Sequence, residues 1–233
     1  MTINHAWLHQ RALDFWLARG AILLVIALQL GVINDLSIGP RWLAPTLEIL
    51  WLIPLSFATA WTQRRARSTD SELVKEVTRW RHGVRRAAIW LTALVTLMNF
   101  GALADLVRAL LAGKAGGGSS LLLDALNIWM TNVITFALWF WNIDHGGPAA
   151  RGLIHTDSYD FLFPQMTLPQ FAEKEWVPGF VDYLFVSFTN ATAFSPTDTM
   201  PLTQRIKLLM MAQAGVSLLT VALVAARAVN ILQ

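Results

Sequence analysis

The chain has 233 residues, of which 55% are hydrophobic and 14% are charged, against roughly 25% charged residues in an ordinary soluble domain. Its formal net charge is +3 and it contains no cysteine. This composition excludes a disordered chain, a disulfide-stapled secreted domain and a Cys-x-x-Cys metal or redox site. Because the charges are segregated from long apolar runs, we expect an all-α polytopic membrane protein.

Five segments are long and apolar enough to cross a bilayer as helices, which takes about 20 mostly apolar residues. They cover residues 15–36, 43–61, 87–111, 120–141 and 204–232. Their continuous apolarity favours helices over barrel strands, which alternate in short pieces. Six tryptophans at or near the span ends are typical of an interfacial aromatic belt: Trp42, Trp61, Trp90, Trp139, Trp141 and Trp176.

The segment 62–86 carries eight of the lysine and arginine residues. Since basic loops stay on the cytoplasmic side, we expect this segment and the N-terminus to be cytoplasmic. Five spans then place residues 145–203 on the same side and the C-terminus outside. In this interpretation the basic residues set the orientation of the chain in the membrane, and no nucleic-acid partner is expected. A capped amphipathic helix is predicted from Ser68 to about Arg86, either as a solvated linker or as a basic helix that faces lipid or a partner.

The predicted elements divide the chain into three parts. Residues 1–143 form a four-helix transmembrane region with the basic loop 62–86. Residues 144–180 form an interhelical loop, and residues 181–233 contain a polar segment followed by the last span.

Residues 181–203 are too polar to span a bilayer. Their first part predicts a short helix with an aromatic face and a hydroxyl-rich end, formed by Tyr183, Phe185 and Phe188 and by Ser187, Thr189 and Thr192. Pro196 and Pro201 prevent the helix from continuing. A short helix, a polar turn and a long apolar helix are the plan of a re-entrant pore loop, because irregular backbone at membrane depth must be buried by protein or line water.

This stretch resembles the pore module of potassium channels, whose pattern is roughly S-F-T-T-V-T-T-V-G-Y-G-D-x-x-P-x-T. The matching positions are Ser187, Phe188, Thr189, Thr192, Asp198, Pro201 and Thr203. Residues 193–197 read A-F-S-P-T where the family has T-V-G-Y-G, so both filter glycines are missing. Those glycines permit the alternating left-handed backbone that aims carbonyls at the ion. The resemblance therefore implies a pore-loop ancestry without a potassium-selective filter.

A second resemblance covers most of the chain. Two helices, a basic loop and two further helices precede a D-F-x-F-P element at residues 160–164 and a D-Y-L-F-x-S-F-T segment at residues 182–189. This order resembles a bacterial multi-pass membrane family of unknown function that has a degenerate potassium-channel-like pore segment. The resemblance implies a fold and a location in the bacterial inner membrane, but no activity.

The side from which the polar segment enters the membrane is a point of conflict. A potassium-channel pore loop enters from outside, whereas the basic residues place this one on the cytoplasmic side. An inverted pore loop, as in ionotropic glutamate receptors, reconciles the two, and so does an error of one span. We favour cytoplasmic entry.

The leading functional hypothesis is a channel-like protein that conducts cations or small polar solutes. One pore loop encloses no pathway, so a homo-oligomer is expected, a tetramer by analogy. The expected pore-lining residues are Thr189, Asn190, Thr192, Ser195, Thr197, Asp198 and Gln213. A non-conducting membrane scaffold or accessory subunit that retains the pore-loop fold is the alternative. A small-molecule transporter is the third, although no repeat or discontinuous span is seen.

Three carboxylates lie in or near predicted spans, where charge is costly and often functional: Glu48, Asp105 and Asp124. Asp105 shares a helix face with Arg108, as a gating pair or as a locally neutralised pair. Gly215, midway along the last span, is either a hinge or a site of close helix packing. Polar side chains expected to join helices by hydrogen bonds are Asn99, Asn127, Asn132 and Gln213.

The loop after the fourth span is rich in possible metal ligands: Asp144, His145, His155, Asp157 and Asp160. Their spacing matches no metal template, so a polar loop is favoured, and no metal or cofactor is expected. The chain has no nucleophile elbow, phosphate-binding glycine loop or dinucleotide fingerprint. We therefore expect no enzyme. The expected partners are the lipid bilayer, further copies of the chain and permeating ions or solutes.

Overall fold

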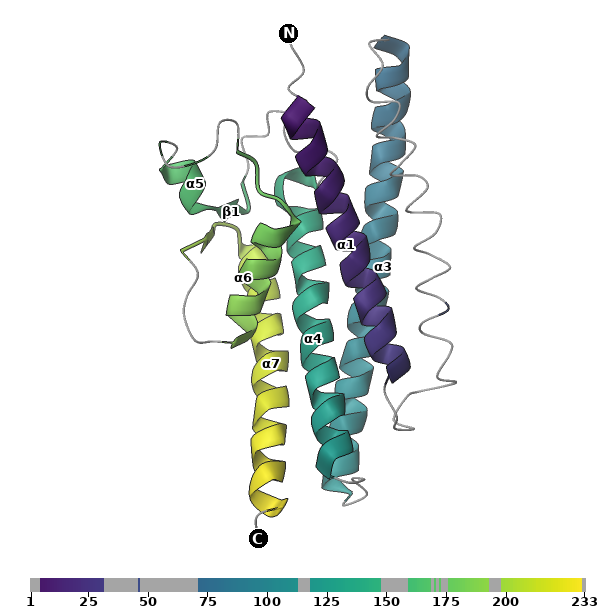
Figure 1. The fold of residues 1–233 in the computed structure, drawn as a ribbon, viewed down its shortest axis with the longest axis vertical. Helices are drawn as coiled ribbons and strands as arrows, with labels where there is room; N and C mark the ends of the chain where they lie inside the picture. Colours follow the sequence, from purple (N-terminus) through teal and green to yellow (C-terminus); the bar gives the residue numbers. More distant parts are fainter. Residues whose placement is uncertain are drawn as a thin grey trace.

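The computed structural model describes residues 5–31, 46, 71–112, 118–147, 159–168, 170, 172, 176–192 and 198–231. The chain is mostly helical (Figure 1). Its longer helices are α1 (His5–Gly31), α3 (Ser71–Leu111), α4 (Gly118–Ile143), α6 (Phe180–Thr192) and α7 (Gln204–Ile231). Between α4 and α6 lie a 3-10 turn η1 (Asp144–Gly146), strand β1 (Phe161–Leu162) and the single-turn helix α5 (Pro164–Thr167). Strand β2 (Met200–Pro201) precedes α7.

Among the described residues, three stretches have the length and apolarity needed to cross a membrane: Gly83–Leu111, Leu121–Gly146 and Gln204–Ala226. They correspond to the predicted third, fourth and fifth spans. Helix α1 coincides with much of the predicted first span, and among the described residues its apolar stretch covers Trp16–Leu28. Apart from Thr46, the predicted second span, residues 43–61, lies outside the described residues, and so does Glu48 within it. The part of the chain that the structure describes is thus helical and contains three candidate membrane spans.

Helix α3 is longer than predicted. It runs without a break for 41 residues from Ser71 to Leu111, whereas the sequence suggested a separate helix that ends near Arg86. Gly83 is the only glycine before the apolar part and no proline occurs there, and an isolated glycine does not end a helix. At 1.5 Å per residue α3 is about 60 Å long, about twice the thickness of a bilayer's hydrocarbon core. Its basic first part therefore extends beyond its apolar part.

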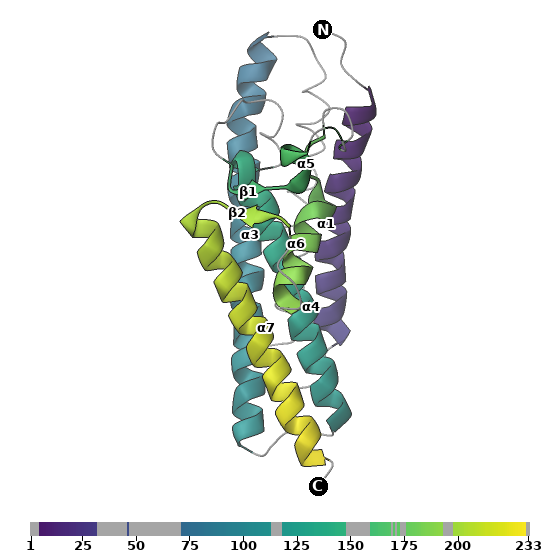
Figure 2. The same ribbon diagram turned by 90° about the vertical axis from the view of Figure 1, so that its left-hand side faces the viewer.

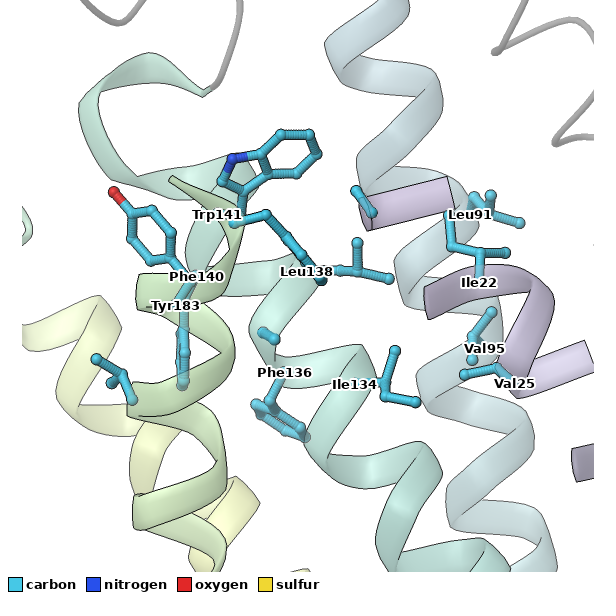
Figure 3. Packing of buried hydrophobic residues seen from close by; sticks show 14 of the residues in the cluster. Ile22, Val25, Leu91, Val95, Ile134, Phe136, Leu138, Phe140, Trp141 and Tyr183 are labelled. Carbon is cyan, nitrogen blue, oxygen red and sulfur yellow. The ribbon is translucent and has the colours of Figure 1, made fainter. Parts of the chain in front are cut away.

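Helix α4 is the centre of the bundle. Its apolar stretch is 67% buried within the chain, against 28% for that of α3 and 22% for that of α7. Side chains of α1 and α3, such as Ile22 and Leu91, pack on one flank of α4, and Tyr183 of α6 packs on the other (Figure 3). A second cluster joins α3, α4 and α7 through Leu103, Leu106, Leu121, Ala125, Ile128 and Val216.

Polar side chains fix how the helices align along α4. Arg85 Nε donates to the Asn142 carbonyl at 3.1 Å, and Asn99 Nδ2 donates to the Ile128 carbonyl at 3.2 Å. Arg85 and Asn99 are 14 residues apart on α3, and their partners Asn142 and Ile128 are 14 residues apart on α4 in the opposite direction. The two helices are therefore antiparallel and stay in contact over this length. The Asn127 and Asn132 side chains bond α4 to α1 and α7 in turn. The expectation that these asparagines join helices is confirmed. Helix α4 runs opposite to the other three: α1, α3 and α7 start at the end of the bundle where α4 stops (Figure 1).

Candidate functional site

The predicted short helix is present as α6, whose 13 residues make it about 20 Å long, too short to cross a 30 Å hydrocarbon core. Tyr183 and Ser187 lie on its fully buried face. Phe185 and Phe188 lie on the opposite face and are 59% and 47% exposed. The predicted single aromatic face is therefore wrong for Tyr183, because 100° per residue places positions 183 and 185 on different sides of a helix.

Two carboxylates hold the first turn of α6. Asp14 of α1 accepts a hydrogen bond from the Phe180 backbone N–H at 3.1 Å, and Asp182 accepts one from Gly179 at 2.7 Å. Negative charge is favourable at a helix N-terminus, where N–H groups lack partners within the helix. A side chain at position 179 would place its Cβ 2.7 Å from Asp14 Oδ1. A glycine at this position therefore leaves room for the Asp14 carboxylate to reach the Phe180 N–H.

A buried hydrogen-bond network, which we call the amide network, joins α6 to α4 and α7. The Gln213 amide nitrogen donates to the Ser187 carbonyl at 2.8 Å and to its hydroxyl at 2.6 Å. Ser187 in turn donates to the Val133 carbonyl at 2.6 Å. Asn190 donates to Gln213 Oε1 and to the Met210 carbonyl, both at 2.9 Å. Every polar side chain of the network thus has a partner, as buried polar groups require.

The first part of α6 lies against a second polar group, the carboxylate cluster of Asp144, Asp160, Tyr183, Thr203 and Arg205, in which the two aspartates and the tyrosine are buried. The Tyr183 hydroxyl and the Asp160 backbone N–H donate to the two carboxylate oxygens of Asp144. The Arg205 guanidinium donates a hydrogen bond to each carboxylate oxygen of Asp160, and the Thr203 hydroxyl donates to Asp160 Oδ1 at 2.6 Å. Both aspartates are 0% exposed.

Asp144 and Asp160 do lie in the connection between α4 and α6, but both carboxylates are buried within the chain, which the interpretation as a polar loop did not predict. Burial of a carboxylate is tolerated where hydrogen bonds and an opposite charge compensate it. Among the described residues no group of three or more His, Cys, Asp or Glu side chains is placed to hold a metal. His155 and Asp157 lie outside those residues.

The two motifs of the whole-chain resemblance meet at this cluster. Strands β1 and β2 pair antiparallel, with Phe161 opposite Pro201, and Leu202 N–H donates to the Asp160 carbonyl at 2.8 Å. The rings of Phe161 and Phe163 lie edge-on to Tyr183, with centroids 6.0 and 5.4 Å apart. The two phenylalanines of the D-F-x-F-P element, Phe161 and Phe163, thus pack against Tyr183 of the D-Y-L-F-x-S-F-T segment. Both motifs are visible in the sequence, but their spacing does not predict this contact.

The chain leaves and returns to the same end of α4. The Phe180 ring lies 5.6 Å from Trp141, while the Phe188 ring lies 5.8 Å from Trp129, twelve residues down α4. By Met200 the chain is back beside β1 and the carboxylate cluster. Figure 2 shows α6 running down beside α4 and α7 starting again near the level of β2.

The expected pore-lining residues have different environments. Gln213 is fully buried in the amide network, which also includes Asn190. The hydroxyls of Thr189 and Thr192 donate to carbonyls of α6 itself, at 2.8 Å and 3.0 Å. Asp198 is exposed beside β2, whereas Ser195 and Thr197 lie outside the described residues.

The other candidates are separate from α6. Asp105 and Arg108 share a helix face as expected and form an ion pair at 3.0 Å. Asp124 is buried near the start of α4. A Cβ at Gly215 would meet nothing within 4 Å among the described residues, so the glycine makes no close helix contact there. Comparison with family models, with curated proteins and with solved structures finds no match for the chain.

Proposed function

We propose that the chain is a channel-like integral membrane protein whose copies assemble around a pathway for cations or small polar solutes. The observation that carries the proposal is the placement of two segments: residues 180–192 run down beside α4, and Met200 and Pro201 lie back at the end of α4 where α6 begins. This placement supports a re-entrant segment. With Phe180 near the interface, α6 ends close to the middle of a bilayer whose hydrocarbon core is about 30 Å thick.

Cytoplasmic entry is the side we propose for this segment. Arg85, in the basic part of α3, bonds to Asn142 near the point where α6 begins. The end from which α6 descends is therefore the end that carries the arginines, and basic segments remain cytoplasmic. This arrangement favours an inverted loop over an error in the number of spans.

The two faces of α6 support a position inside the membrane. Its polar residues Ser187 and Asn190 bond within the chain, while Val181, Phe185 and Phe188 face outward. A short helix in water has the opposite arrangement, with its apolar stripe turned inward. An outward apolar face is suited to lipid or to a second copy of the chain. Because one α6 encloses no pathway, conduction requires an oligomer.

The pathway we propose runs past Thr192 and Asp198 and the hydroxyl residues between them in the sequence, Ser195 and Thr197. Hydroxyl oxygens and a carboxylate favour cations over anions. Asn190 and Gln213 hold α6 in place instead, because their polar atoms are already bonded within the chain.

A non-conducting scaffold is the second candidate, and the amide network is the observation that favours it. A network that seals the contact between α6 and α7 keeps the loop fold without any need for a pathway. This candidate predicts an oligomer with a closed axis, or a monomer.

Reconstitution of the purified full chain into liposomes tests the proposal. Cation flux should depend on the protein, and Asp198→Asn should reduce the preference for cations over anions. Asp105→Asn is the matched control, since Asp105 pairs with Arg108 far from α6. Oligomeric protein with an unaltered unfolding temperature but without flux would support the scaffold and contradict the channel.

A further inference from the structure

Two exposed cations, Arg86 of α3 and Lys207 of α7, lie at one height of the bundle. Arg85 bonds to Asn142, so Arg86 is level with the last turn of α4. Asn132 bonds to Gln213, so Lys207, six residues earlier on the antiparallel α7, is level with the last two turns of α4. Each cation also lies near the start of a candidate membrane span. Both are therefore placed where an apolar helix enters the bilayer.

Exposed tryptophans mark the same level. Trp90 follows Arg86 by one turn of α3 and is 70% exposed. Trp16 of α1 is 67% exposed and lies two residues after Asp14, which bonds to the first residue of α6. Tryptophan side chains concentrate at the headgroup level of a bilayer, where one edge of the ring is apolar and the other is wet. The height of Arg86 and Lys207 is thus the height of lipid headgroups.

The neighbouring cations already have partners in the chain. Arg85 donates to the Asn142 carbonyl, Arg205 is bound by Asp160, and Arg19 lies over the Trp16 ring at 5.2 Å. Arg86 and Lys207 are exposed and form no ion pair with any residue that the structure describes. Asp198 is an exposed acid near this end, and it too forms none with those residues.

We propose that Arg86 and Lys207 bind the phosphates of anionic phospholipids in the leaflet at this end of the bundle. Phosphate oxygens are the natural partners of lysine and arginine. Each basic residue near an anionic membrane surface contributes attraction that decays within a Debye length. The proposal requires that the chain lie in a membrane, but it holds whether or not the chain conducts.

Lipid binding to the purified full chain in detergent micelles tests this site, with native mass spectrometry to count bound phosphatidylglycerol and phosphatidylcholine. Phosphatidylglycerol should bind more tightly, and its advantage should fall with added salt. Arg86→Gln and Lys207→Gln should each weaken its binding about fivefold, the factor that corresponds to about 1 kcal/mol per cation. Arg108→Gln is the matched control, because Arg108 is exposed at the other end of α3 and is paired with Asp105.

Charge-conserving variants keep the test decisive. Arg86→Lys and Lys207→Arg should retain the preference for phosphatidylglycerol, and all variants should keep the wild-type unfolding temperature in phosphatidylcholine. The proposal is overturned if the glutamine variants bind phosphatidylglycerol like the wild type, or if Arg108→Gln weakens binding as much. An equal loss in the charge-conserving variants would also overturn it.

Discussion

Gln213 of α7 donates both of its amide hydrogens to Ser187 of α6, to the carbonyl and to the hydroxyl, and both side chains are fully buried. The pair sets how α6 is rotated about its own axis. Because Ser187 faces α4 and α7, Phe185 faces away from them, and Phe188 lies at the edge of the contact, where it meets Trp129 of α4 and stays 47% exposed. The buried contact thus helps to turn the apolar side chains of α6 outward.

Replacement of Gln213 by leucine should destabilise the chain. The substitution keeps a similar volume but removes the acceptor of Asn190 and a donor to Ser187. Buried hydrogen bonds between membrane helices contribute about 1–2 kcal/mol at most, and we expect a loss of about that size in the free energy of unfolding. Gln204→Leu, at the exposed start of α7, is the control. Equal stability of the two variants in detergent would show that the network contributes nothing.

Removal of the Tyr183 hydroxyl should also be costly. Tyr183→Phe leaves a carboxylate oxygen of the fully buried Asp144 without its phenolic donor. Hydrogen bonds to charged groups contribute about 1.5–3 kcal/mol, so thermal unfolding should occur at a clearly lower temperature. Tyr159→Phe removes a hydroxyl from a tyrosine that is 44% exposed, and it should change the unfolding temperature little. A larger effect of Tyr159→Phe would contradict the role of the carboxylate cluster.

The glycines of the α6–α7 region should respond differently to alanine. Gly179→Ala forces the Asp14 carboxylate away from the Phe180 N–H and should cost about 0.5–2 kcal/mol, the range for loss of a helix N-cap. At Gly215 a methyl group meets no described atom, so Gly215→Ala should stabilise α7 by about 1 kcal/mol. Unfolding in detergent measures both. If Gly215 is a hinge, as the sequence suggested, alanine there would alter conduction instead of raising stability alone.

Helix positions were predictable because apolar length is a local property of the sequence. The fourth and fifth spans, predicted at 120–141 and 204–232, appear as Gly118–Ile143 and Gln204–Ile231. The change from charged to apolar residues near Arg86 predicted two helices, whereas α3 is continuous from Ser71 to Leu111 because no helix-breaking residue lies between the two parts. Composition changes at a membrane surface, but the backbone of a helix need not change with it.

The candidate site was only partly predictable, because partners far apart in sequence decide it. Asp144 and Tyr183 are 39 residues apart, and nothing local to either residue identifies the other. Gln213 was expected either to line a pore, because it lies on the last span that follows the polar segment, or to join helices by hydrogen bonds. The structure supplies that partner inside the chain, at Ser187. Helical spacing alone would have separated Tyr183 from Phe185, since positions two apart do not share a face.

The most direct test of the account is the sidedness of the two ends of the segment 180–201. The chain has no cysteine, so one introduced cysteine is the only site for a thiol reagent. Leu168 and Leu202 are 48% and 46% exposed on either side of the segment, and Leu111, at the other end of the bundle, is 84% exposed.

Single variants Leu168→Cys, Leu202→Cys and Leu111→Cys are labelled with a membrane-impermeant thiol reagent in sealed vesicles of known orientation. The account predicts that positions 168 and 202 react from the same side and position 111 from the opposite side. Reaction of positions 168 and 202 from opposite sides would mean that the segment crosses the membrane, and it would contradict the re-entrant path on which the proposed function depends.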